Sequence, residues 1–344
     1  MRATVGDIPW ISVAAVILVG TALATALLIF ALGPLLRRYA LAKPGIRSSH
    51  QIPTPQGGGI AVVTAAAVAI CICFLVLLPA PGMWLQLSTL LGAVILLASV
   101  GALADTRPFA IAPRLVLQIV AVAAVIYQLP PDLRILPIIP AWVERTLLVF
   151  GGVWFVNLMN FMDGLDWLTV AQVVPITGAI ALIGLLVPLP VEAVVVSLAI
   201  CGAMIGFSFF NRPVAKLFLG DVGSLPIGLV IGWLLVLLAA SGGRAAAFLL
   251  PLYSVADSTI TLLRRLVSGE RAWEAHRSHF YQRATDGGFS VTDVVTRVFA
   301  TNITLAGLAV LSVIYPGRIS QIGAVVFGAM LVGWLLVTFA RGRR

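Results

Sequence analysis

Long apolar runs separated by short polar breaks dominate this 344-residue sequence, and they restrict it to a membrane. Residues 59–79 and 224–240, for example, contain no charged side chain. A lipid core offers no hydrogen-bond partners to the backbone, so runs of about 20 apolar residues are expected to cross it as helices. Only 10% of the residues are charged and 60% are hydrophobic, which excludes a soluble globular protein, where about a quarter are charged.

We therefore predict an all-α polytopic membrane protein with about eleven transmembrane helices. The chain is expected to form a single membrane domain over residues 1–344, because its longest polar-rich stretch, 264–293, is too short for a core of its own. The first run exceeds the length of a signal-peptide core and is expected to remain as a span. The predicted spans are 10–33, 59–79, 83–104, 112–129, 141–159, 168–188, 190–210, 224–240, 245–265, 294–315 and 318–340.

The basic residues predict the orientation of these spans. Most of the 22 Lys and Arg residues lie in the breaks on one side, which the positive-inside rule assigns to the cytoplasm. The N-terminus is then outside, the C-terminus is inside, and the polar motifs face the cytoplasm. The net charge of +9 fits attraction to lipid headgroups or phosphates better than nucleic acid.

All three histidines and five of the acids lie in the polar breaks. The first break, residues 43–59, carries Lys43, Arg47 and His50 and ends in three glycines before a helix. Exposed backbone amides and cationic groups there suit a phosphate. The alternative is a turn with basic anchors, in which the glycines serve close helix packing.

The second break contains Asp105, which suits a divalent cation or an ion pair with Arg107 or Arg114. In the third break Asn157, Asn160 and Asp163 recur every three residues, and Asp166 continues the spacing. A continuing helix would place these oxygen-bearing side chains broadly on one face. Helix capping explains one such residue but not four, so an oxygen-rich pocket for Mg²⁺ and a polar ligand is favoured.

The fourth break places Asp221 between glycines at a loop-to-helix junction, which suits close approach of a ligand or metal, or capping. The fifth follows Asp257 and carries His276, Arg277 and His279. Histidines and arginines around one turn predict an anion clamp. A zinc site is an alternative, but no cysteine lies nearby and its remaining ligands would have to be remote acids. An amphipathic interfacial helix is a third interpretation.

Taken together, these motifs resemble the polyprenyl-phosphate N-acetylhexosamine-1-phosphate transferase family, glycosyltransferase family 4. The order of the motifs matches from Arg47 to Arg283, and the resemblance is closer to the enzymes that initiate O-antigen and common antigen than to the peptidoglycan translocase. The strings that carry it are Arg47-Ser-Ser-His50, Asn160-Phe-Met-Asp163-Gly164-Leu-Asp166, Gly220-Asp221-Val-Gly223-Ser224 and Ala275-His276-Arg277-Ser278-His279.

The resemblance implies a multi-pass inner-membrane enzyme with a cytoplasmic site, whose substrates are a UDP-linked amino sugar and polyprenyl phosphate. It implies Mg²⁺, with Mn²⁺ as an alternative, and Asp221, Asn160 and Asp163 as the metal-holding residues. The catalytic set it implies is Asp105, Asp163, Asp166 and Asp221. The implied substrate-binding set is Lys43, Arg47, His50, Asn157, Asn160, His276, Arg277 and His279. No nucleic acid is expected, and a homodimer is left open.

Three positions depart from the family's pattern. Relatives usually carry two adjacent aspartates where this chain has Ala104-Asp105, many have glycine at Trp167, and Gln56 replaces a common arginine. The missing aspartate keeps a catalytically degenerate membrane scaffold as an alternative. A secondary transporter of an anionic substrate is another, although transporters usually place their sites near the midplane and in repeated halves.

Overall fold

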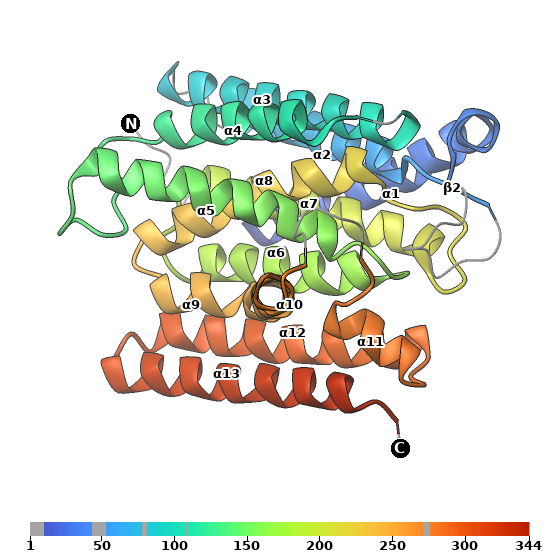
Figure 1. The fold of residues 1–344 in the computed structure, drawn as a ribbon. Coiled ribbons are helices and arrows are strands. Elements are labelled where there is room, and N and C mark those ends of the chain that lie inside the picture. Colours follow the sequence, from blue (N-terminus) through green and yellow to red (C-terminus); the bar gives the residue numbers. More distant parts are fainter. Residues whose placement is uncertain (1–9, 43–52, 78–80, 108, 271–275, 344) are drawn as a thin grey trace.

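The computed structural model describes residues 10–42, 53–77, 81–107, 109–270 and 276–343, and almost all of its regular structure is helical. The long helices lie side by side as a bundle, with α3 and α4 forming one outer layer and α12 and α13 the opposite one (Figure 1). The elements are α1 (Trp10–Tyr39), β1 (Leu41–Ala42), β2 (Thr54–Pro55), α2 (Gly58–Leu77), α3 (Pro81–Thr106), α4 (Ile111–Tyr127), α5 (Ala141–Phe161), α6 (Leu168–Leu186), α7 (Val191–Asn211), α8 (Asp221–Ala240), α9 (Arg244–Leu249), α10 (Leu252–Val267), α11 (Phe280–Asp286), α12 (Val291–Ile314) and α13 (Arg318–Arg341).

Eight of the described helices are long and apolar enough to cross a membrane: α1, α2, α3, α6, α7, α8, α12 and α13. The all-α polytopic class is thereby confirmed. Helix α4 is a shorter apolar helix. The number of eleven spans remains a prediction, and so does the orientation of the chain in the membrane.

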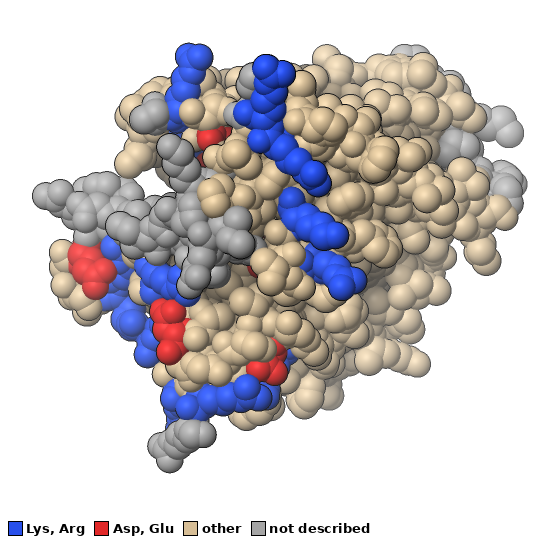
Figure 2. All heavy atoms as spheres, turned by 90° about the vertical axis from the view of Figure 1, so that its right-hand side faces the viewer, with Lys and Arg blue, Asp and Glu red and all other residues tan. Residues whose placement is uncertain are grey.

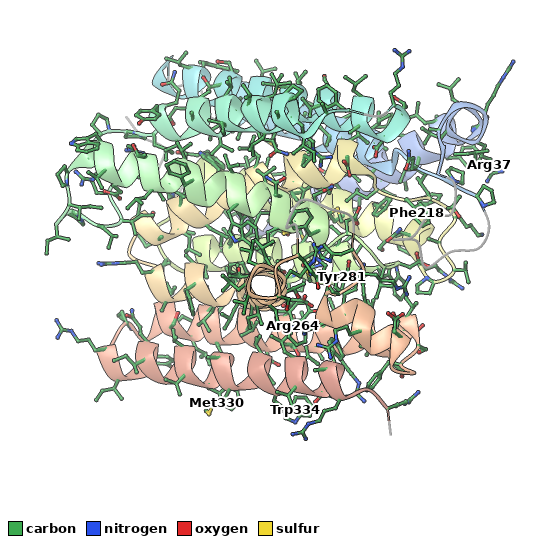
Figure 3. All side chains as sticks on the ribbon, viewed as in Figure 1. Arg37, Phe218, Arg264, Tyr281, Met330 and Trp334 are labelled. Atoms are coloured by element: carbon green, nitrogen blue, oxygen red, sulfur yellow. The ribbon has the colours of Figure 1, made fainter. Side chains whose placement is uncertain are left out.

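Helices α6, α7 and α8 form the centre of the bundle. In the most apolar stretch of each of these helices, between 72% and 83% of the residues are buried. The corresponding share is 28% in α1 and in α13. On α13, Met330 and Trp334 point away from the other helices, as side chains that face lipid would (Figure 3).

Close backbone approach joins α1 to α7. A Cβ atom at Gly202 would lie 2.3 Å from the carbonyl oxygen of Leu18, and one at Gly206 would lie 2.2 Å from that of Ala22. Two small residues four positions apart let two helices pack through their backbones. Such close packing matters in lipid, because apolar side chains there gain little from leaving a solvent that is itself apolar.

The ninth predicted span, 245–265, is wrong as one continuous helix. The chain instead forms the short helix α9, breaks at Leu250-Pro251, and continues as α10. Helix α10 is seen end-on in Figure 1, where its neighbours run across the view. Proline lacks the N–H that a continuing helix requires, which accounts for the break.

Candidate active site

The polar breaks between the helices gather at one end of the bundle, the right-hand end in Figure 1, where α3, α5, α7 and α13 end and α8, α11 and α12 begin. Lys and Arg side chains collect on this end, with fewer acids among them (Figure 2). Its exposed basic residues include Arg37, Arg38, Arg212 and Lys216.

Asp105 holds the start of α8. Its Oδ1 accepts a hydrogen bond from the backbone N–H of Asp221 at 3.0 Å, and its Oδ2 accepts one from Val222 at 3.1 Å. These N–H groups belong to the first turn of a helix, where they have no partner within the helix and attract negative charge. Cation binding and an ion pair were the two roles predicted for Asp105. The structure shows a further one, because this carboxylate caps the start of α8.

Asp221, thus fixed at the start of α8, meets Asn160 at the end of α5. The Asn160 amide donates to Asp221 Oδ1 at 2.6 Å and to the Ser224 hydroxyl at 2.8 Å. The guanidinium of Arg114 bridges both residues, at 2.9 Å from Asp221 Oδ2 and 3.1 Å from Asn160 Oδ1. Two oxygens from two helices therefore converge on a single cationic group.

Asp163 lies three residues beyond Asn160, in the connection between α5 and α6. It is half-buried and accepts a hydrogen bond from the hydroxyl of Thr169. Desolvation raises the pKa of its carboxyl to about 8, and the negative charges of Asp221 and Asp105 act in the same direction. Asp163 would therefore be mostly protonated at pH 7 and would ionise when a cation is placed beside it.

Asp166 and Trp167 attach the connection between α5 and α6 to α7 and to the loop that follows it. The buried Asp166 accepts a hydrogen bond from the backbone N–H of Ala215 at 2.9 Å, which ties the turn to the loop after α7. Trp167 has a φ of +64°, the left-handed conformation that glycine adopts without strain. Its indole N–H donates to the Ser208 carbonyl at 2.7 Å, so the side chain is held against α7.

Asn157 lies one turn below Asn160 on α5. Its amide donates to the side-chain oxygen of Gln118 at 2.7 Å and to the Val153 carbonyl at 2.8 Å. These bonds link α5 to α4, the helix that carries Arg114.

Residues 276–279, where an anion clamp is predicted, lie around a buried carboxylate, Asp257. His279 Nδ1 lies 3.1 Å from Oδ1 of Asp257, and the ring of His279 packs against that of His276 at 4.9 Å between centroids. Arg277, which precedes α11, pairs with Asp286 at the end of that helix at 3.1 Å.

Tyr281 joins this clamp to the acidic pocket. Its hydroxyl donates to the carbonyl of Phe161 at 2.9 Å, two residues before Asp163. It points into the bundle between α10 and the end of α5 (Figure 3). A Cβ atom at Gly164 would lie 2.1 Å from the Tyr281 hydroxyl oxygen, so the glycine of the third break makes room for this contact.

Lys43, Arg47 and His50 lie outside the described residues. Of the glycines in the same break, Gly58 and Gly59 use their backbone N–H groups on the carbonyls of Phe218 and Leu219, each at 2.9 Å. A Cβ atom at Gly59 would lie 2.3 Å from Gly223 Cα. The packing interpretation therefore accounts for these two glycines, and the amides of both are already engaged.

The structure thus brings Asp105, Asn160, Asp163 and Asp221 to one place. His279 packs against Phe161 at the end of α5, with 6.2 Å between ring centroids. Among the described residues, no cluster of three or more His, Cys, Asp or Glu side chains has the geometry of a metal site. The donor set nevertheless suits a divalent cation, because Asp221 Oδ2 and Asn160 Oδ1 already share one cationic partner.

The sequence motifs predict no functional role for Asp257, and for Arg114 only an ion pair with Asp105. Arg114 lies nine residues after Asp105, just inside the next helix, and this position places it at the same end. Asp257 is an ionisable residue within the predicted span 245–265, a signal that usually marks function.

Carboxylates, amides and two histidines thus lie at one end of a bundle of membrane-spanning helices. These features define a polytopic helical membrane protein with a polar site at one end. Residues 87–239 match the model of glycosyl transferase family 4. The matched segment contains the acidic pocket and Arg114 but not the clamp.

Curated relatives are consistent with this match. The chain is 32% identical over 176 residues to phospho-N-acetylmuramoyl-pentapeptide-transferase of Oceanobacillus iheyensis, covering 49% of this chain and 51% of that protein. It is 30% identical over 205 residues to the protein of the same name from Mycobacterium leprae, covering 54% and 55%. The alignments thus span about half the length of these relatives, and they do not place the chain in a subfamily.

Proposed function

We propose that this chain transfers the sugar 1-phosphate of a UDP-linked N-acetylated amino sugar to polyprenyl phosphate, in particular undecaprenyl phosphate. The products are a polyprenyl-diphosphate-sugar and UMP, and the reaction would initiate a cell-surface polysaccharide. The observation that carries the proposal is the convergence of Asp221 and Asn160 on one cationic group, beside Asp163 and the His279 clamp.

In this reaction an oxygen of the lipid phosphate attacks the β-phosphorus of the UDP-sugar. The bond between that phosphorus and the bridging oxygen breaks, and its electron pair leaves with UMP. Phosphoryl transfer of this kind depends on positioning and on neutralising charge, which is what the residues at this end supply.

Asp221 and Asn160 would hold Mg²⁺, or Mn²⁺ in its place, with Asp163 as the next carboxylate. A bound divalent cation neutralises charge on the phosphates. Arg114 supplies a positive charge at the same point. His276, Arg277 and His279 would hold the phosphates of the sugar nucleotide, together with Lys43, Arg47 and His50.

Asp105 would act by holding α8, not by removing a proton. Both of its oxygens are engaged by backbone N–H groups. A phosphate monoester has a second pKa of about 6 and is mostly dianionic at neutral pH, so the lipid phosphate needs no strong base. This accounts for an enzyme that has Ala104 where relatives carry an aspartate. Asp166 would position the same pocket through its bond to Ala215.

We further propose that residues 1–344 form one membrane domain with this end in the cytoplasm, where UDP-sugars are available. The collection of Lys and Arg on this end (Figure 2) supports the orientation, since cytoplasmic loops are enriched in them.

The test is UMP release by purified protein given Mg²⁺, a UDP-amino sugar and polyprenyl phosphate. Release that requires the lipid phosphate and disappears in Asp221→Asn supports the transferase. Uptake of the nucleotide sugar into liposomes without UMP would contradict it and favour a transporter. An inactive protein that Ala104→Asp makes active would identify a degenerate family member.

A further inference from the structure

Asp257 is a fully buried carboxylate to which no role has been given. It lies on α10, and its exposed fraction is 0%. Its Oδ1 accepts the backbone N–H of Phe280 at 3.1 Å, and its Oδ2 accepts that of Tyr281 at 3.2 Å. The hydroxyl of Tyr253 donates to Oδ2 at 3.3 Å. Both oxygens therefore act as acceptors, which is the arrangement of a carboxylate.

The Thr261 hydroxyl donates to Oδ1 of Asp257 at 3.4 Å, and Nδ1 of His279 lies 3.1 Å from the same oxygen. A carboxylate has no proton to donate, so Nδ1 must carry the hydrogen of this bond. The neutral imidazole then has its lone pair on Nε2, on the other side of the ring.

The ring of His279 is also held on its faces. Tyr281 stacks against it at 5.5 Å with an interplanar angle of 16°, and His276 packs at 4.9 Å. Phe161, at the end of α5, lies 6.2 Å away between centroids. Position and tautomer of the ring therefore depend on Asp257, while its neighbours tie it to the helix that carries Asn160.

We propose that Asp257 is a positioning residue that fixes His279 in its Nδ1–H tautomer and directs Nε2 toward a phosphate of the nucleotide sugar. The part of this proposal that concerns the phosphate rests on the proposed function. The part that concerns the tautomer does not. When Nε2 is protonated it can donate to a phosphate oxygen, and the buried carboxylate then faces a cationic ring.

The break at Pro251 makes this arrangement available. It turns α10 out of the direction of its neighbours (Figure 1), so that a residue within a predicted span meets the first turn of α11. A continuous ninth span would have left Asp257 at membrane depth, where an unpaired carboxylate is costly.

The chain contains only three histidines, which makes a direct test practical. Protein labelled with ¹⁵N-histidine in detergent gives up to three ring systems, and His279→Gln assigns one of them. The ligand-free wild type is expected to show the neutral ring of His279 with Nδ1 protonated and Nε2 unprotonated. Finding the proton on Nε2 would overturn the proposal, whatever the variants do.

Asp257→Asn is expected to shift His279 toward the Nε2–H tautomer, because the new amide can donate to Nδ1. It should also raise KM for the UDP-sugar about tenfold. The matched control is Asp293→Asn, which alters a capping carboxylate at the start of α12. It should leave the tautomer unchanged and KM within twofold of wild type. An unchanged tautomer in folded Asp257→Asn protein would contradict the proposal.

Addition of UMP with Mg²⁺ to the labelled wild type tests the phosphate contact. A change in the Nε2 resonance of His279 supports it, and no change overturns the assignment of Nε2 as the contacting atom. If the tautomer is as expected but no UMP is released in the transferase assay, the proposed function fails and the positioning by Asp257 stands.

Discussion

The carboxylate of Asp105 binds the backbone of Asp221, accepting its N–H at 3.0 Å and that of the next residue at 3.1 Å. One acid of the pocket therefore holds the helix that presents the other. Asp257 accepts two successive N–H groups at the start of α11 in the same way. Each of these helix starts is capped by a carboxylate from another helix and carries or adjoins a proposed site residue, Asp221 at α8 and His279 at α11.

Asp105→Asn is expected to lower the stability of the protein by about 1–2 kcal/mol, because the amide can accept from only one of the two N–H groups. Transferase activity should fall with it, since α8 carries Asp221. Thermal unfolding in detergent and UMP release measure the two effects. Asp132→Asn, at an exposed aspartate, is the control. A variant as stable as wild type but inactive would contradict the positional role and favour a proton-transfer role.

Arg114→Gln removes the cation that Asp221 and Asn160 share. Mn²⁺ binding to the ligand-free variant, followed by electron paramagnetic resonance, should tighten by about fivefold, since a nearby positive charge opposes a cation by about 1 kcal/mol in a well-solvated site. The kcat/KM of transfer should fall about tenfold or more, because a charged hydrogen-bond donor is lost. Arg264→Gln, at an exposed arginine of α10, should change neither. Weaker Mn²⁺ binding in Arg114→Gln would show that the two oxygens do not form the cation site.

Much of this fold was predictable from hydropathy, but the pairing of helix ends was not. The apolar runs predicted the helices because backbone groups in lipid must pair within a segment. Hydropathy alone missed the break at Pro251, since α9 and α10 are joined by apolar residues. The three-residue spacing predicted one helical face for Asn160 and Asp163, but α5 ends at Phe161, before Asp163. The bridge from Arg114 to Asn160 joins two residues that are 46 positions apart in sequence.

Trp167 allows the strain of the turn after Asp166 to be measured. Trp167→Gly and Trp167→Ala lose the same side-chain contacts, but only glycine adopts a φ of +64° without penalty. The glycine variant should therefore be more stable than the alanine variant by about 1 kcal/mol in thermal or denaturant unfolding. Equal stability of the two variants would show that the turn relaxes when the indole is removed.

The raised pKa of Asp163 predicts proton release on cation binding. At pH 7 the pH is below the pKa of about 8, so the carboxyl is mostly protonated and a bound cation expels the proton. Calorimetric Mg²⁺ titrations at pH 7 should depend on the ionisation enthalpy of the buffer, and this dependence should fade at pH 9. Asp163→Asn should remove it, while Asp132→Asn should not. Buffer-independent heats in the wild type would place the cation away from Asp163.

The destination of the β-phosphorus tests the central claim most directly. Purified protein is given a UDP-amino sugar labelled with ³²P at the β-phosphate, together with Mg²⁺ and polyprenyl phosphate, and the products are separated into lipid and aqueous phases. We predict that the label enters the lipid phase while unlabelled UMP forms in equal amount, and that Asp221→Asn abolishes both. Label that remains in aqueous UDP while the sugar alone reaches the lipid would contradict sugar 1-phosphate transfer.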